Sequence, residues 1–154
     1  SISFCERYPD MSAVIIDMAS ALTNTEALIA QEHLSDRISL RPGNLLDGDW
    51  DTGYDVAFYL SVAHNQTAED NRQVIRRIGQ VLRPGGLLVI HEYLAEAPLL
   101  PFHAAFRLTL LVETATRTYS FKEVCGWLDE AGFAAPTRID LDPLEKGTLI
   151  IARR

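Results

Sequence analysis

Two residues whose side chains are suited to proton transfer, His64 and Glu92, each follow an apolar run of the sequence. The two runs, residues 55–60 and 87–90, have the composition of strands that are buried on both faces of a parallel sheet. Open α/β sheets bind ligands just beyond the carboxyl ends of such strands. An ordinary imidazole, with a pKa of about 6.5, can remove a proton from a phenolic hydroxyl at neutral pH if it reaches that oxygen. Glu92 could hold the imidazole tautomer or bind a substrate directly, while a histidine buried for structural reasons is the competing interpretation of His64.

Asp17 and Asn44 also follow expected strands. A carboxylate at the position of Asp17 can accept both hydroxyl hydrogens of a ribose cis-diol, although a helix cap or turn is an equally good interpretation. The amide of Asn44 could pair with the edge of a purine while Leu45 or Leu46 covers the purine face. The alternative for Asn44 is an ordinary Asx turn.

The elements that would position these side chains alternate along the chain. Strands are expected over residues 12–17, 37–40, 54–61, 87–90, 137–141 and 148–152. Helices are expected over residues 1–9, 23–34, 67–82, 102–112 and 120–131. Thr67 can cap the third helix, Pro84-Gly85-Gly86 would end it, and Ser120 to Glu123 form a capping box. This order is typical of an α/β fold, and the last two strands are expected to form an antiparallel hairpin.

Composition restricts the classes of function. With 154 residues, 47% of them hydrophobic and 23% charged, the chain has the size of one globular domain spanning residues 1–154. A formal net charge of −7 disfavours binding to a phosphate backbone, so we expect a small-molecule partner and no nucleic acid. The sequence contains neither the roughly 20 apolar residues of a membrane span nor a signal pattern, so we expect a cytoplasmic protein without a membrane partner. Two isolated cysteines and four scattered histidines predict no disulfide framework and no metal site.

Six short motifs occur along the chain, and each alone is weak. They are Tyr-Pro-Asp at 8–10, Val-Ile-Ile-Asp at 14–17, Pro-Gly-Asn-Leu-Leu at 42–46, His-Asn at 64–65, Leu-Arg-Pro-Gly-Gly at 82–86 and Glu-Ala-Gly-Phe at 130–133. Their order and spacing together resemble the catalytic domain of class I S-adenosylmethionine-dependent O-methyltransferases, over essentially the whole chain. More narrowly, the chain is similar to the group that includes plant caffeate and flavonoid enzymes and bacterial polyketide-tailoring enzymes.

The resemblance implies a Rossmann-like sheet, mostly parallel with a C-terminal antiparallel hairpin, and S-adenosylmethionine as the cofactor. In the family, the acid at the Asp17 position binds the cofactor ribose, and the residue at the Met18 position packs on adenine. Asn44 stands where the family has an acid that hydrogen-bonds adenine. The cofactor-binding residues implied in this way are Asp17, Met18, Gly43, Asn44, Leu45, Leu60 and Ser61.

The resemblance also implies a reaction, methyl transfer to a hydroxyl of a small aromatic or polyketide-like molecule. His64 stands at the position of the family's general base, and Glu92 at the position of a glutamate that orients the base. A second family glutamate would fall near Thr118, where this chain has none. Phe102 and Phe106 could line the acceptor pocket or be simple core.

The family's first strand and glycine-rich loop would lie before Ser1, together with its N-terminal dimerisation domain. Because that strand is central in the family's sheet order, 3-2-1-4-5-7-6, the strands present are expected to form two groups. We therefore expect an N-terminally truncated catalytic domain, weakly active alone and homodimeric at full length, or a gap filled by a rearranged or partner element. A non-catalytic fragment that serves binding or association remains the alternative, and a nicotinamide oxidoreductase is a third possibility.

Overall fold

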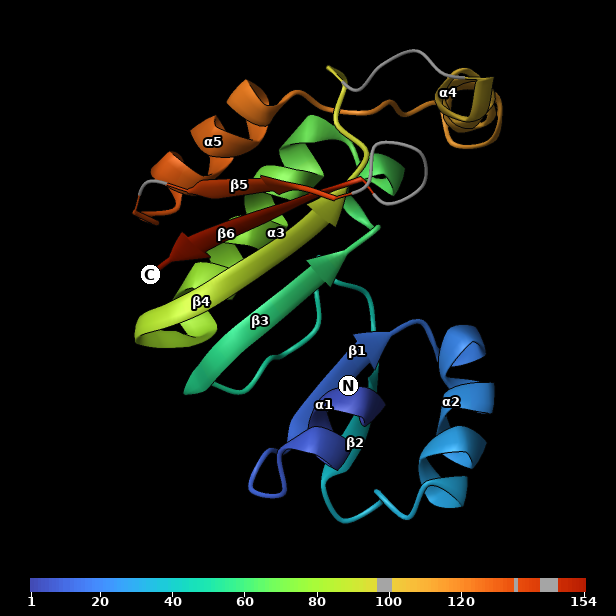
Figure 1. Cartoon of the computed structure of the whole chain (residues 1–154), viewed down its shortest axis with the longest axis vertical. Helices are drawn as coiled ribbons and strands as arrows, with labels where there is room; N and C mark the ends of the chain where they lie inside the picture. Colours follow the sequence, from blue (N-terminus) through green and yellow to red (C-terminus); the bar gives the residue numbers. More distant parts are fainter. Residues whose placement is uncertain (97–100, 135, 142–146) are drawn as a thin grey trace. The chain divides into compact units, whose positions relative to one another are not determined.

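The structure is a computed structural model that describes residues 1–96, 101–134, 136–141 and 147–154 (Figure 1). The described residues form two compact units, residues 1–49 and residues 50–154. The strands form a two-stranded sheet, β1-β2, and a four-stranded sheet of order β3-β4-β6-β5. The α/β fold class and the expected division of the strands into two groups are thereby confirmed.

The first unit is built on two parallel strands. Its elements in chain order are α1 (Ile2–Arg7), β1 (Ala13–Asp17), α2 (Ala19–Gln31) and β2 (Ile38–Pro42). The strands pair with Asp17 opposite Pro42, so the chain leaves both strands at the same edge of this sheet. Its core consists of four buried side chains, Cys5, Ile29, Leu34 and Ile38.

The second unit is a mixed sheet with helices. Its elements are β3 (Tyr54–Leu60), the 3₁₀ helix η1 (Ala63–Asn65), α3 (Ala68–Val81), β4 (Leu82–Glu92), α4 (Pro101–Glu113), α5 (Phe121–Glu130), β5 (Thr137–Asp140) and β6 (Thr148–Arg153). β3 and β4 are parallel, whereas β6 is antiparallel to both β4 and β5. The expected terminal hairpin is confirmed in its strands, while Pro143 in its connection lies outside the described residues. α3 packs against β4 and α5, and Figure 1 shows it behind the sheet.

Both expected helix caps are present. The hydroxyl of Thr67 accepts a hydrogen bond from the Asp70 N–H at 3.2 Å, and the Asp70 carboxylate accepts one from the Thr67 N–H at 3.3 Å. Ser120 and Glu123 make the same reciprocal pair at the start of α5, at 3.2 and 2.8 Å. These caps satisfy amide groups that a helix leaves unpaired in its first turn, so they fix where α3 and α5 begin.

One expected strand boundary and one expected helix boundary were wrong. The third helix ends at Val81, close to the expected residue 82, but the next strand begins at Leu82 and not at residue 87, because Leu82 is already extended and pairs with Tyr54 as the first residue of β4. Gly85, with a φ of +83°, therefore lies within β4. α2 begins at Ala19, earlier than the expected residue 23, because the extended Met18 directly after β1 serves as its N-cap.

The expectation that β3 is buried on both faces was also wrong. Tyr59 on one face is 3% exposed, whereas the other face exposes 37% of Val56, 41% of Phe58 and 47% of Leu60. Successive side chains of a strand point to opposite faces, so a cover on one side buries only every second residue. The uncovered face explains why an apolar composition alone overestimated the burial of this strand.

Replacing Glu123 with glutamine should make the unit less stable and change its response to acid. The hydrogen bond from Arg117, then that from Ser120, lowers the pKa of Glu123 from 4.5 to about 2. A carboxyl whose pKa is lowered by folding stabilises the protein above its ordinary value, and this contribution is lost as the pH falls from 4.5 toward about 2. Because 36% of this side chain is exposed, solvent screens the pair, and we expect a loss of about 0.5–1 kcal/mol at neutral pH.

The measurement is urea unfolding followed by circular dichroism between neutral pH and the lowest pH at which the chain remains folded. The difference between wild type and Glu123→Gln should shrink as the carboxyl is protonated. Glu113→Gln, which removes an exposed carboxylate from the last residue of α4, is the control and should show no such trend. A difference that stays constant with pH would contradict the assigned role of Glu123.

Candidate active site

The structure brings His64 and Glu92 into direct contact. His64 lies in η1, just after β3, and Glu92 is the last residue of the neighbouring strand β4. The Nδ1 atom of His64 is 2.7 Å from Oε2 of Glu92, and the two residues are 7% and 4% exposed. The other carboxylate oxygen accepts a hydrogen bond from the backbone N–H of Ala63 at 2.8 Å. One buried carboxylate thus fixes both the imidazole ring and the turn that carries it.

The contact with Glu92 determines what the other ring nitrogen can do. A carboxylate accepts hydrogen bonds, so it favours the tautomer of neutral His64 in which Nδ1 carries the proton. Nε2 then has a free lone pair, and none of the residues that the structure describes donates a hydrogen bond to it. This is the arrangement of a general base whose orientation is set by an acid.

Two buried side chains hold the turn from the side of α3 and β3. The amide nitrogen of Asn71, in the first turn of α3, donates to the carbonyls of Ala63 at 2.9 Å and Thr67 at 3.0 Å. Its amide oxygen accepts a hydrogen bond of 2.9 Å from the hydroxyl of Tyr59. Burial, and then the charge of Glu92, raises the pKa of Tyr59 above its ordinary value, so that hydroxyl remains a donor.

Two further side chains hold the same turn from the segment between α4 and α5. The hydroxyl of Thr116 donates to the carbonyl of His64 at 2.6 Å, and the hydroxyl of Tyr119 donates to the carbonyl of Gln66 at 2.6 Å. Thr118, near which the second family glutamate would fall, is 6% exposed. This chain therefore has hydroxyl groups around the turn where the resemblance led us to look for an acid.

Aromatic rings cover one side of the imidazole. The ring of Phe106, on α4, meets the ring of His64 edge-on with 5.0 Å between centroids. The ring centroids of Tyr93 and Phe106 are 5.2 Å apart, and the ring of Phe102 stacks on that of Phe106 at an interplanar angle of 8°. Arg107 ties α4 to the segment after β4 by donating to the carbonyl of Ala95 at 2.7 Å. Of the two expected acceptor-lining residues, Phe106 thus lies beside His64, and Phe102, which is 49% exposed, packs behind it on Phe106.

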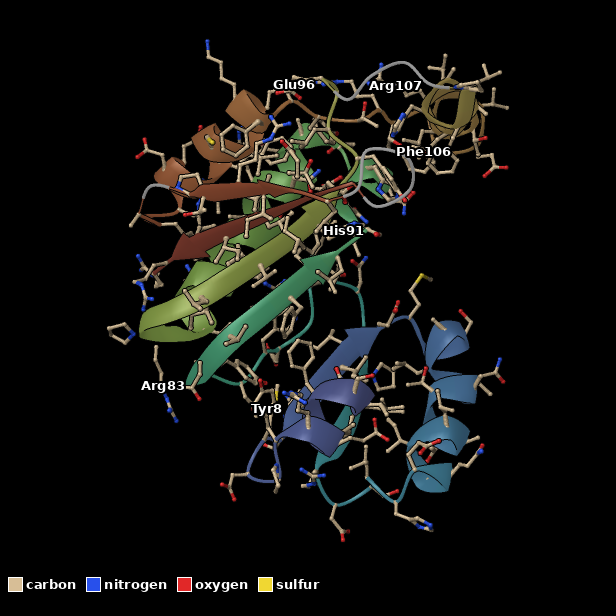
Figure 2. The ribbon with its side chains drawn as sticks, in the orientation of Figure 1. Tyr8, Arg83, His91, Glu96, Phe106 and Arg107 are labelled. Carbon is tan, nitrogen blue, oxygen red and sulfur yellow. The ribbon has the colours of Figure 1, made fainter. Side chains whose placement is uncertain are left out.

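Ser61 and Leu60 lie at the end of β3 in the same unit. Ser61 has a φ of +55°, its N–H donates to the carbonyl of His91, and its hydroxyl is 3.0 Å from Nδ1 of His91. His91 lies near the carboxyl ends of β3 and β4 (Figure 2). The side chain of Leu60 is among the exposed apolar groups of this strand. Both expected cofactor residues are therefore accessible at the edge of the sheet that carries His64.

The other expected cofactor residues belong to the first unit. Asp17 is exposed at the end of β1, and one of its oxygens accepts the N–H of Met18 at 2.8 Å. The described residues donate no hydrogen bond to the second carboxylate oxygen, and Met18 is 66% exposed. An open carboxylate followed by an exposed apolar side chain fits the ribose and adenine of a nucleoside.

Asn44 makes the Asx turn that the sequence left open as an alternative. Its side-chain oxygen accepts the N–H of Leu46 at 3.0 Å, which leaves the amide nitrogen for another partner. Gly43 has open space where a side chain would begin, and Leu45 is half-buried. The prediction that Asp17 and Asn44 share one pocket with His64 and Glu92 stays a prediction, because the two pairs belong to different units.

The sequence analysis missed Asn71, Thr116 and Tyr119. A signal for Asn71 was present, because it falls at helical spacing before Val74 and Ile78 on the face that is buried. A polar residue on such a face needs hydrogen-bond partners, so its position alone could have marked it. Thr116 and Tyr119 offered no comparable pattern, since they lie in a segment without periodicity.

Neither a metal site nor a membrane-spanning helix is found among the described residues. No three of their His, Cys, Asp or Glu side chains are arranged to hold a metal ion. None of the helices described is both long and apolar enough to cross a membrane.

The second unit thus combines a parallel strand pair, a buried contact between His64 and Glu92, and aromatic rings beside the imidazole. The chain matches the O-methyltransferase domain family over residues 2–134 and belongs to that family. It is 27% identical to the L-tyrosine C(3)-methyltransferase of Streptomyces lavendulae, over 100% of this chain and 44% of the relative. It is 25% identical to the 3-hydroxy-5-methyl-1-naphthoate 3-O-methyltransferase of Streptomyces sahachiroi, over 85% of this chain and 39% of the relative.

Solved structures support the same fold. The crystal structure of an O-methyltransferase family 2 protein from Planctomyces limnophilus in complex with apigenin matches with a TM-score of 0.86 and 24% identity. The match covers 99% of this chain and 46% of that chain. The chain thus spans less than half the length of the relatives named here.

Replacing Glu92 with glutamine should reverse the tautomer of His64. A glutamine side chain keeps one acceptor oxygen but adds an NH₂ group, and two donors now compete for that oxygen. When the oxygen serves the Ala63 N–H, the NH₂ group faces Nδ1, which then must accept, and the proton moves to Nε2. Long-range ¹H–¹⁵N correlation spectra, which distinguish protonated from bare ring nitrogens, measure this change directly.

Glu96→Gln is the matched control, because Glu96 accepts the backbone N–H of Phe121 and makes no hydrogen bond to His64. It should leave the His64 signals at their wild-type positions. If Glu92→Gln also leaves them unchanged, the carboxylate does not set the tautomer.

Proposed function

We propose that residues 1–154 belong to one S-adenosylmethionine-dependent O-methyltransferase domain, which methylates a hydroxyl of a small aromatic or polyketide-like molecule. The observation that carries the proposal is the buried contact of 2.7 Å between His64 and Glu92, with Phe106 against the imidazole ring. Membership of the O-methyltransferase domain family and relatives named as aromatic methyltransferases support the same class of reaction. The homodimer expected for the full-length protein is part of this proposal.

His64 would act on the acceptor through Nε2. With Nδ1–H bound to Glu92, the Nε2 lone pair would take the proton of the acceptor hydroxyl. The acceptor oxygen would bond to the methyl carbon as the bond from that carbon to the sulfonium sulfur breaks and the sulfur leaves as a thioether. Glu92 stabilises the imidazolium that results, because the carboxylate remains charged beside it. General-base help of this kind contributes about 10²- to 10⁴-fold in rate.

S-adenosylmethionine would supply a methyl group that is already electrophilic on its sulfonium. The protein's main task is then to align the acceptor oxygen, and alignment of this kind provides roughly 7–11 kcal/mol. Phe106 and Tyr93 offer aromatic faces on which a planar acceptor could pack next to His64. The reaction would therefore depend mostly on geometry and to a smaller extent on the base.

The residues present fit a nucleoside-containing donor. Asp17 has a carboxylate oxygen that no described residue occupies, Met18 exposes an apolar side chain beside it, and both precede α2. Asn44 would contribute only its amide N–H groups, since its oxygen is engaged by Leu46. Gly43 and Leu45 lie beside Asn44 in the first unit, and Leu60 and Ser61, at the end of β3 in the second unit, remain expected cofactor residues of that unit.

Methyl transfer to an aromatic carbon is a second candidate, favoured by the relative named as an L-tyrosine C(3)-methyltransferase. Removal of a phenolic proton by His64 would spread negative charge to the ring carbons ortho to the oxygen, so the same base would serve either product. In the C-methylated product the ortho carbon also loses its hydrogen as a proton, which restores the aromatic ring and the phenol. Fragmentation of the product by mass spectrometry distinguishes the two, because an O-methyl group and a ring methyl group are lost differently.

Asp17→Ala should weaken the binding of S-adenosylmethionine. Loss of hydrogen bonds to a charged carboxylate corresponds to an affinity about 10- to 100-fold lower. Isothermal titration of S-adenosylmethionine into this chain and into the full natural chain measures the effect. Asp36→Ala, which removes an exposed acid of the same unit, is the control and should bind as the wild type does. Absence of binding in both wild-type chains would leave the non-catalytic alternative standing.

His64→Ala should lower turnover and leave cofactor affinity unchanged. We expect turnover in the full natural chain to fall by about 10²- to 10⁴-fold, because proton removal then depends on water. Initial rates with a phenolic acceptor and titration with S-adenosylmethionine measure the two quantities separately. His33→Asn, at an exposed left-handed position that asparagine tolerates, is the control. Equal losses of turnover and affinity would indicate a structural histidine.

A further inference from the structure

Asn71 is a fully buried amide on an otherwise apolar helix face. Its side chain is 0% exposed, as is that of Val74 one turn later, and Ile75 is 1% exposed. An amide buried without partners costs free energy, so an apolar residue would be the simpler choice at such a position. The hydrogen bonds of Asn71 should therefore show what the amide is for.

Those hydrogen bonds converge on the turn that carries His64. The amide nitrogen donates to the carbonyl of Ala63, the residue before His64, and to the carbonyl of Thr67, the residue that caps α3. The amide oxygen accepts the hydroxyl of Tyr59, which lies on the buried face of β3. The side chain thus links β3, the turn and α3 at the two ends of the segment that contains the imidazole.

We infer that Asn71 is a positioning residue for His64, holding the turn so that the Nδ1–H of the ring meets Glu92 and Nε2 faces the acceptor. This inference rests on the proposed function, in which His64 is the base. The Ala63 N–H bonds Glu92 while the Ala63 carbonyl bonds Asn71, so the same peptide segment is held from two sides. A second orienting glutamate would fall near Thr118, where this chain has none. The orientation of the imidazole then depends more strongly on the rigidity of the turn that carries it.

The test reads the ring and not the reaction. At about pH 8.5, where an ordinary imidazole is neutral, long-range ¹H–¹⁵N spectra of this chain report which ring nitrogen of His64 carries the proton. In the wild type we expect the Nδ1–H form, with an Nδ1 proton protected from exchange. In Asn71→Ala the carbonyls of Ala63, Gln66 and Thr67 lose their contacts with the side-chain amide, so we expect the Nε2–H form to appear and protection of the Nδ1 proton to fall about tenfold.

Ile78→Ala is the matched control. It removes a buried side chain from the same helix, two turns further from the turn, and should lower the urea midpoint without moving the His64 signals. A structural role for Asn71 alone would make the two variants alike, with both stabilities lowered and both tautomers unchanged. That result would overturn the inference.

Tyr59→Phe keeps the inference falsifiable if Asn71→Ala fails to fold. It removes only the hydroxyl that fixes the amide oxygen, so we expect a smaller shift of the His64 signals in the same direction. Wild-type His64 signals in folded Tyr59→Phe, with Asn71→Ala unfolded or equally unaffected, would overturn the inference. This test measures no methyl transfer, so the two proposals can fail separately. Normal turnover in His64→Ala would contradict the role of His64 as the base and leave the positioning by Asn71 intact. Unchanged His64 signals in Asn71→Ala would contradict the positioning and leave the role of the base intact.

Discussion

The arrangement of the second unit depends on one buried carboxylate with two donors. Glu92 is 4% exposed and accepts hydrogen bonds from the backbone N–H of Ala63 and from Nδ1 of His64. A buried charge without partners is strongly unfavourable, so folding of the unit favours the arrangement in which both donors meet the carboxylate. The orientation of the imidazole is therefore coupled to folding itself and is not left to the rotamer freedom of one side chain.

The surrounding elements meet the requirements of that carboxylate. β3 and β4 are parallel, with Leu60 opposite His91, so the turn after β3 begins next to the end of β4 where Glu92 stands. The capping box at Thr67 starts α3 directly after the turn and limits how far the turn can move. Asn71 then reaches back from the first turn of α3. The register of β3 and β4, the start of α3 and the hydrogen bonds of Asn71 thus all act on the short turn between β3 and α3.

Much of this fold follows from local patterns in the sequence. Apolar runs located β3 and β4, Thr67 marked the start of α3 as a cap, and the capping box of Ser120 and Glu123 marked the start of α5. The contact between His64 and Glu92 joins residues 28 positions apart, and it became predictable only because both follow strands of one parallel sheet. The bonds of Asn71, Thr116 and Tyr119 could not be predicted in this way, because they join elements whose spacing the sequence does not encode locally. Burial of β3 was overestimated for a related reason, since composition does not tell which face has a cover.

The lack of an acid near Thr118 is consistent with uncharged side chains holding the turn around His64. These side chains are Asn71, Thr116 and Tyr119. The carbonyl of Tyr119 accepts the N–H of Ala95 at 2.8 Å, so this segment runs beside the residues that follow Glu92. A second buried carboxylate there would repel Glu92, and one of the two would tend to take up a proton. Hydroxyl and amide groups donate to backbone carbonyls without adding charge, so among the residues described Glu92 is the one acid that the imidazole contacts. Uncharged donors therefore hold the turn without disturbing the charge of Glu92, the acid that orients the His64 ring.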